Sequence, residues 1–81
     1  MYENSFVDSS VKIGKNSSIG NFISIFQDVV IGSNVKIDDG ARIYDGCKIG
    51  DNSVIGANAV LRPKKIIWIK ISIFYFTFFK I

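Results

Sequence analysis

The sequence contains no histidine, and this absence narrows the chemistry open to the chain. Histidine is the commonest general base near neutral pH, the commonest metal ligand and the usual activator of nucleophiles. Only one cysteine, Cys47, is present, so the chain cannot form an internal disulfide and fits a reducing compartment. Residues 1–10 lack both a basic region and an apolar stretch, so we expect no signal peptide and a cytoplasmic location.

Basic residues are few outside the last twenty positions. Residues 1–61 hold five basic and seven acidic side chains, a net charge of −2, whereas residues 62–81 hold five basic and no acidic ones, a net charge of +5. A basic patch at one end is a weak nucleic-acid signal, so we interpret it as a flanking cluster and expect no nucleic-acid partner. With 81 residues, the chain can form one small domain.

An aliphatic residue recurs at every sixth position through most of the chain. The ten consecutive positions are Val7, Ile13, Ile19, Ile25, Ile31, Ile37, Ile43, Ile49, Ile55 and Leu61. A second set, mostly small or β-branched, lies four residues after each aliphatic, as Val35 does after Ile31. A period of six is not a multiple of 3.6, and paired inward positions two residues apart require a strand. Each hexad is therefore predicted to be a short strand followed by a turn.

A second period of eighteen residues lies on top of the first. The segments Ile13–Asn16, Ile31–Asn34 and Ile49–Asn52 share the pattern Ile-Gly-x-Asn, so three hexads make one triangular coil. Asn tolerates the left-handed backbone region that suits a sharp corner, and Gly32 with its equivalents is expected to let the chain turn without a clashing Cβ. The predicted fold is all-β, a single-stranded parallel β-helix of about three to four coils.

These repeats resemble the hexapeptide-repeat acyltransferase superfamily, in which an aliphatic residue is followed by Gly or an acid, two free positions and a small residue. The resemblance covers residues 1–62 and implies a left-handed coil, which spacing cannot reveal because most parallel crossovers are right-handed. The run Ile43–Asn52 is most similar to enzymes that acetylate amino-sugar nucleotides. The resemblance thus implies the N-terminal, truncated part of an acetyl-CoA-dependent acyltransferase.

In that superfamily, active molecules are usually trimers, a catalytic His activates the acceptor, and acetyl-CoA lies in a groove between adjacent prisms. No catalytic residue can be carried over to this chain because it has no His. We expect no metal site, no activity of the chain alone and no assignable cofactor-binding residue. The alternative interpretation is a non-catalytic structural or oligomerisation solenoid.

Several single residues admit both a structural and a functional interpretation. Cys47 occupies a small inward position, where packing is a better explanation than nucleophilic catalysis. Phe26 and Tyr44 lie eighteen apart and should stack on one face, either as an inter-subunit patch or as an ordinary surface ladder. The acidic residues at predicted turns are expected to be solvated corners rather than metal ligands; they are Asp38, Asp39, Asp45 and Asp51.

The repeat is expected to stop at Pro63, which divides the chain into a β-helix domain, residues 1–62, and an apolar, basic tail, residues 63–81. Lys65 would occupy a small inward position, which a repeat would not favour. Residues 66–73 alternate Ile with other residues, which favours a strand, and the tail is short for a membrane span. Two origins remain open: residues read from a shifted frame or A/T-rich DNA, or a genuine apolar plug that closes the coil.

Overall fold

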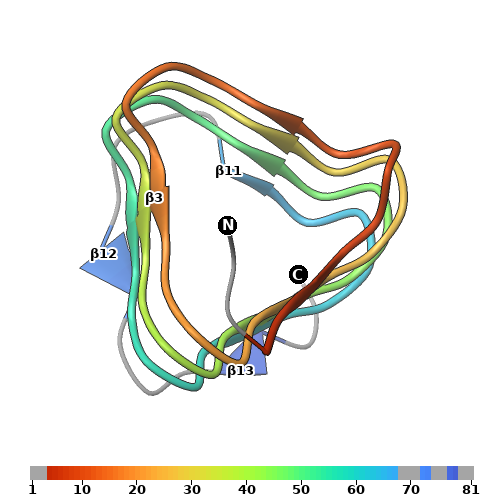
Figure 1. The fold of residues 1–81 in the computed structure, drawn as a ribbon. Coiled ribbons are helices and arrows are strands. Elements are labelled where there is room, and N and C mark those ends of the chain that lie inside the picture. The colour runs from red at the N-terminus through yellow and green to blue at the C-terminus, as the bar shows by residue number, and fades with distance from the viewer. Residues whose placement is uncertain (1–3, 68–71, 74–76, 79–81) are drawn as a thin grey trace.

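The computed structural model describes residues 4–67, 72–73 and 77–78, and these residues form a parallel β-solenoid with a triangular cross-section (Figure 1). Within these ranges there are thirteen strands of two residues each, joined by turns, and no helix. The prediction of an all-β parallel β-helix is therefore confirmed.

The strands fall into three parallel sheets, one on each side of the triangle. Sheet A contains β1 (Phe6–Val7), β4 (Ser24–Ile25), β7 (Arg42–Ile43), β10 (Val60–Leu61) and β13 (Thr77–Phe78). Sheet B contains β2 (Lys12–Ile13), β5 (Val30–Ile31), β8 (Lys48–Ile49) and β11 (Ile66–Ile67). Sheet C contains β3 (Ser18–Ile19), β6 (Lys36–Ile37), β9 (Val54–Ile55) and β12 (Ser72–Ile73).

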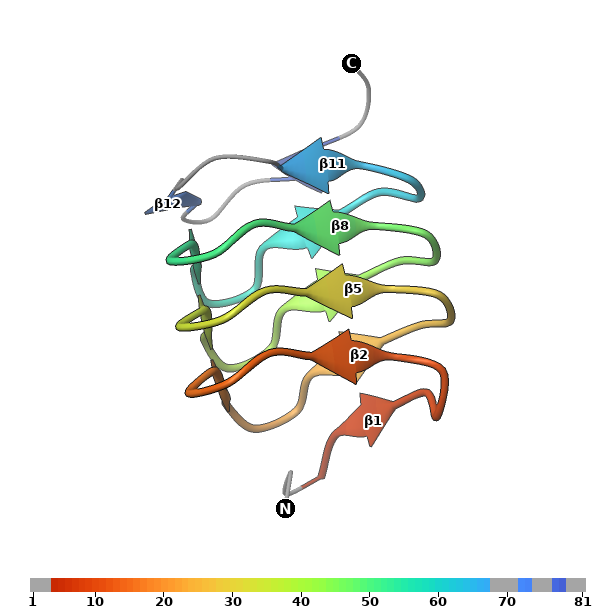
Figure 2. The ribbon, with the colours of Figure 1, turned by 90° about the horizontal axis from the view of Figure 1, so that it is seen from above.

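The pairing follows the eighteen-residue period. In sheet B, Ile13 pairs with Ile31 and Ile31 with Ile49, so these residues form one column as predicted. In Figure 1 the chain runs anticlockwise from the near, N-terminal end, and Figure 2 shows the coils rising in order toward the C-terminal end. A coil that turns anticlockwise while it recedes is left-handed, which is the hand that the resemblance implied.

The core is a thin apolar column inside the prism. Most of the repeated aliphatic side chains are fully buried, and burial of each contributes on the order of 1.5–3 kcal/mol. Val7, Ile13 and Ile19 are only partly buried, because among the described residues the first coil has a neighbour on one side only. One polar side chain, Ser53, is buried in the described core, and its hydroxyl donates to the Gly50 carbonyl oxygen at 3.0 Å.

The corners turn at the third residue after each aliphatic, which is Asn at most corners of sheet B and Gly at Gly40 and Gly46, rather than at the residue directly after the aliphatic. Asn16, Asn34 and Asn52 have φ values of 62°, 59° and 65°, in the left-handed region that Asn tolerates. Gly32 has no positive φ, so it is not the residue at which the backbone takes the left-handed conformation. A Cβ on Gly32 would contact the Asp51 carboxylate and lie 2.9 Å from the Asp51 backbone nitrogen, so glycine is needed because adjacent coils approach closely.

Serine side chains tie neighbouring coils together near the corners. The Ser17 hydroxyl donates to the Gly32 carbonyl oxygen at 2.8 Å and accepts from the Val35 backbone N–H at 3.0 Å. The Ser5 hydroxyl similarly accepts from the Ile23 N–H at 2.9 Å. These bonds satisfy backbone groups that the short strands leave without ladder partners. Every buried side-chain nitrogen or oxygen of the described residues has a hydrogen-bond partner.

The strand ladder does not stop at residue 62, where the sequence indicated the end of the repeat. Ile67 is buried and pairs with Ile49, and the half-buried Lys65 occupies the inward position before it. The strands β12 and β13 continue sheets C and A, but Thr77 pairs with Val60 at a spacing of seventeen rather than eighteen residues. The division into two domains stays a prediction, although the solenoid itself includes β11.

The alternating residues at positions 68–71 lie outside the described residues, so the strand expected there has no structural test. No helix long and apolar enough to cross a membrane occurs in the part of the chain that the structure describes.

Candidate functional site

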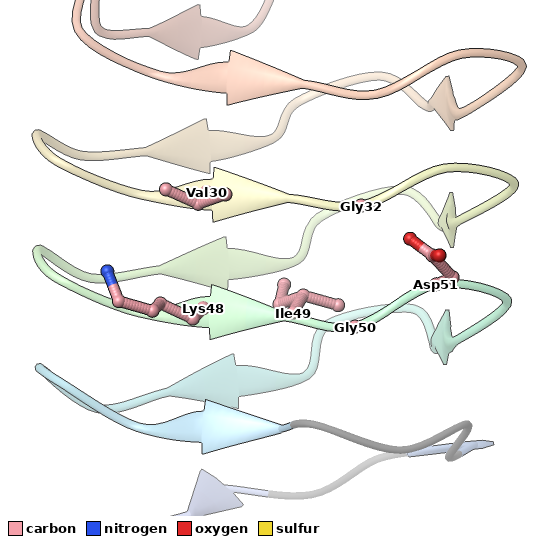
Figure 3. A pocket seen from close by; sticks show the side chains of 6 residues that line it. All are labelled: Val30, Gly32, Lys48, Ile49, Gly50 and Asp51. Carbon is pink, nitrogen blue, oxygen red and sulfur yellow. The ribbon is translucent and has the colours of Figure 1, made fainter.

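The outer surface of sheet B carries a shallow depression of about 310 Å³ between β5 and β8 (Figure 3). Gly32 and Gly50, which follow these two strands, line it and add no side chains to it. Lys48 lies toward one end of the depression and Asp51 toward the other. The glycines that allow close stacking of the coils therefore also line this depression.

The polar groups of this depression offer little for catalysis. One oxygen of the Asp51 carboxylate accepts a hydrogen bond from the Ser33 backbone N–H at 2.8 Å, so this carboxylate ties two coils together. Asp39 does the same at another corner, where it accepts from the Asn21 N–H at 2.8 Å. Both bonds span eighteen residues, and sequence reasoning placed these acids at turns without finding this role. Lys48 is the one amine that lines the depression.

The resemblance implies acetyl-CoA, and the residues that line this depression do not fit the whole cofactor. Coenzyme A carries a diphosphate and a further phosphate, so its site needs several cationic or N–H donors. The depression brings one amine, from Lys48, and one carboxylate, from Asp51, which would repel a phosphate. Its volume is at the low end for a small-molecule pocket, and it is open to solvent. No reaction step through the cofactor follows from this surface.

Cys47 lies in the core, where its side chain is fully buried. Its thiol contacts the Arg62 carbonyl oxygen at 3.1 Å. Burial is the main cause that raises the pKa of the Cys47 thiol above its ordinary value. Since the thiolate is the reactive form, this cysteine packs as an apolar residue, as the sequence indicated.

The acidic residues form no metal centre in the part of the chain that the structure describes. There, no group of three or more His, Cys, Asp or Glu side chains comes close enough together to hold a metal ion.

Aromatic side chains form a column on the outside of sheet A. The rings of Phe26 and Tyr44 are stacked, with centroids 5.0 Å apart and planes 11° apart, as their spacing predicted. The tilted Phe6 ring lies 5.7 Å from Phe26, and the Arg62 guanidinium lies 5.8 Å from the Tyr44 ring centre. Sequence reasoning missed Arg62, although it follows Tyr44 by eighteen residues and its position was therefore open to prediction.

Part of the chain matches the model of a known protein family. Residues 28–63 match the family described as bacterial transferase hexapeptide (six repeats). The matched segment runs through the strands from β5 to β10, where the ladder is continuous. Neither a curated protein nor a solved structure matches the chain. The family match and the parallel solenoid together support the hexapeptide-repeat superfamily.

Proposed function

We propose that the chain is the N-terminal repeat part of an acetyl-CoA-dependent acyltransferase that acts on an amino sugar or a sugar nucleotide, and that it is inactive alone. The transferase hexapeptide match of residues 28–63 supports the reaction class. The resemblance of Ile43–Asn52 to sugar-nucleotide acetyltransferases supports the acceptor. A trimer, whose groove between prisms would complete the cofactor site, and a cytoplasmic location belong to the same proposal.

The absence of a general base carries the proposal of inactivity. Acyl transfer to an amine or hydroxyl needs a base with a pKa near neutrality, together with donors aimed at the developing oxyanion. The sequence has no His, and the reference pKa values of Asp and Glu lie near 4. At the depression on sheet B, the one carboxylate is already hydrogen-bonded to backbone.

A thiol-release assay tests this proposal directly. The purified chain, shown to be folded by circular dichroism, is mixed with acetyl-CoA and a panel of amino-sugar nucleotides. We expect no release of coenzyme A above the uncatalysed rate. Turnover that Asp51→Asn abolishes, while Asp45→Asn leaves it intact, would overturn the proposal, because it would give the chain its own base.

A non-catalytic structural or oligomerisation solenoid is the second candidate, and exposed aromatic side chains on sheet A and at its corner favour it. Phe6 is 51% exposed and Phe22 is 64% exposed, which is unusual for side chains of this size. Sequencing the DNA beyond the codon for Ile81 separates the two candidates. Further hexads and a His in another frame would support the acyltransferase part, whereas the same stop in related genes would support the solenoid.

A further inference from the structure

Sheet A differs from the other two sheets in the residues that follow its strands. The column after β1, β4, β7 and β10 reads Asp8, Phe26, Tyr44 and Arg62, so it begins with an acid and ends with a base. Neighbouring parallel strands lie about 4.8 Å apart, which places the two charges about 14 Å apart along the solenoid. The stacked rings of Phe26 and Tyr44 occupy the space between them.

We propose that sheet A binds a second copy of this chain, with the two solenoids antiparallel and related by a twofold axis that runs along the strand direction. This axis passes between the levels of β4 and β7. It places Asp8 opposite Arg62 of the second copy, and Phe26 opposite Tyr44 of the second copy. Because an isologous contact repeats each pairing, two opposite-charge pairs and two aromatic pairs form at once.

The same operation matches the remaining outer positions of sheet A. Phe6, which is 51% exposed, lies opposite Val60 of the second copy, so an apolar side chain meets an apolar side chain. At the corner, the 64% exposed Phe22 lies level with Gly40 of the second copy, which has no side chain to obstruct it. Arg42, which is exposed on β7, lies opposite Ser24 of the second copy, so its charge faces a hydroxyl rather than an acid. The operation thus covers the exposed Phe6 and pairs the charges of Asp8 and Arg62.

The charges select the antiparallel arrangement. In a parallel pair, each strand lies level with the same strand of the second copy, so Asp8 is level with Asp8 and Arg62 with Arg62, and neither charge meets an opposite one. The other sheets lack the complementarity. On sheet B the antiparallel operation sets Val30 against Lys48 of the second copy, and Lys12 against Ile66 of the second copy. Only sheet A, among the described faces, pairs opposite charges in this way.

The contact area indicates a weak association. The prism is 21 Å across, so the four paired strands β1, β4, β7 and β10 cover on the order of 400 Å², below the roughly 800 Å² per partner of a stable interface. The contact is therefore expected at high protein concentration, from about 10 μM upward. It rests on the solenoid and the sheet A column, and the outcome of the acyl-transfer assay does not affect it.

Twofold pairing fixes the number of copies as even. A pair forms if sheet A is the only contact, and six copies form if a trimer also assembles through the other faces. Either way, weakening the sheet A contact should halve the particle. This outcome separates the proposed contact from a simple trimer.

Sedimentation analysis of the full chain at increasing concentration tests the proposal through charge changes. We expect Arg62→Asp to weaken pairing at least about tenfold, because it places two acids opposite each other twice. Lys48→Asp makes the same change of net charge on sheet B and should leave pairing unchanged. The double change Asp8→Arg with Arg62→Asp should restore pairing, because the swapped charges still meet as opposites only in the antiparallel arrangement.

The Asp8 change also removes a turn contact, so Phe6→Ser provides an independent variant on the same face. We expect it to weaken pairing because it removes the apolar contact with Val60 of the second copy, while circular dichroism confirms the fold. Three results would each overturn the proposal: a monomer at every concentration, a trimer that Arg62→Asp does not change, or equal sensitivity to Arg62→Asp and Lys48→Asp.

Discussion

Sheets A and B use the same hexad but fill the position after the aliphatic residue in opposite ways. Sheet B has Gly14, Gly32 and Gly50 there, and its surface is hollowed between β5 and β8. Sheet A has side chains there, and they stack into a raised column that includes Phe26 and Tyr44. The buried aliphatics therefore determine the fold, whereas this single position determines whether a face is a depression or a ridge.

The difference arises because each residue sits directly above its equivalent eighteen positions away. Coils about 4.8 Å apart suit stacked rings, whose centroids lie 5.0 Å apart here. The same spacing leaves no room for a Cβ on Gly32, which would meet the Asp51 backbone. Residues at this position stack on one another from coil to coil, as rings on sheet A and as glycines on sheet B. The two sheets should therefore respond differently to substitution there.

The largest expected effect lies in the core, which the two sheets share. Ile31→Asp buries a carboxylate without a partner in a thin apolar column, and we expect it to abolish cooperative folding, since the cost exceeds about 4 kcal/mol. Val30→Asp is the matched control, because Val30 precedes Ile31 but is 39% exposed and should change the melting temperature little. Thermal melts followed by circular dichroism would contradict the core assignment if both variants behaved alike.

A smaller effect is expected when a side chain is added at the glycine position of sheet B. Gly32→Ala should destabilise the fold by about 1–3 kcal/mol, because its Cβ would lie 2.9 Å from the Asp51 backbone nitrogen. This loss outweighs the gain of about 0.4–1 kcal/mol that Gly→Ala brings by restricting the unfolded chain. Urea unfolding measures the difference, with Ser33→Ala as the neighbouring control. A more stable Gly32→Ala variant would show that the coils are farther apart.

Removing a ring from sheet A should cost less. Tyr44→Ala removes the stack with Phe26 and the Arg62 contact, which together contribute about 1–2 kcal/mol. Lys48→Ala, an exposed change on sheet B, should stay within about 0.5 kcal/mol of the parent. Equal unfolding midpoints in urea for the two variants would mean that the column adds no stability to the monomer.

The smallest effect is expected at the acidic end of the sheet A column. The Ser10 hydroxyl and backbone N–H donate to Asp8 and lower its pKa below the ordinary value of 3.8. Its ionised form therefore stabilises the fold above pH 3.8, and this contribution is lost as the pH falls through the lowered pKa. Asp8→Asn should melt slightly below the parent at pH 6, and the difference should shrink as the pH falls below 3.8. A difference that grows on acidification would contradict this sign.

Much of the fold was predictable because each coil repeats the same inward positions. The columns through Ile31 and Ile37, the corner role of Asn34 and the stacking of Phe26 on Tyr44 follow from periods of six and eighteen. The continuation of the ladder through Ile67 was missed, because Pro63 and Lys65 interrupt the side-chain pattern while the backbone pairing persists.

The candidate site was less predictable, because its features depend on contacts between coils. The capping of the Ser33 N–H by Asp51 and the close approach at Gly32 require the distance between stacked backbones, which no sequence pattern contains. The contact of Arg62 with Tyr44 could have been predicted, because the two residues are eighteen positions apart.

The most direct test of the eighteen-residue stacking is a nuclear Overhauser spectrum of the folded chain at low concentration, where the sheet A contact between copies should not form. Phe26 and Tyr44 ring protons should give strong cross-peaks, since their centroids lie 5.0 Å apart, and Tyr44 ring protons should also show contacts to the Arg62 side chain. Absence of the Phe26–Tyr44 cross-peaks in a folded sample, or ring contacts at any spacing other than eighteen residues, would contradict the solenoid register and the sheet A column.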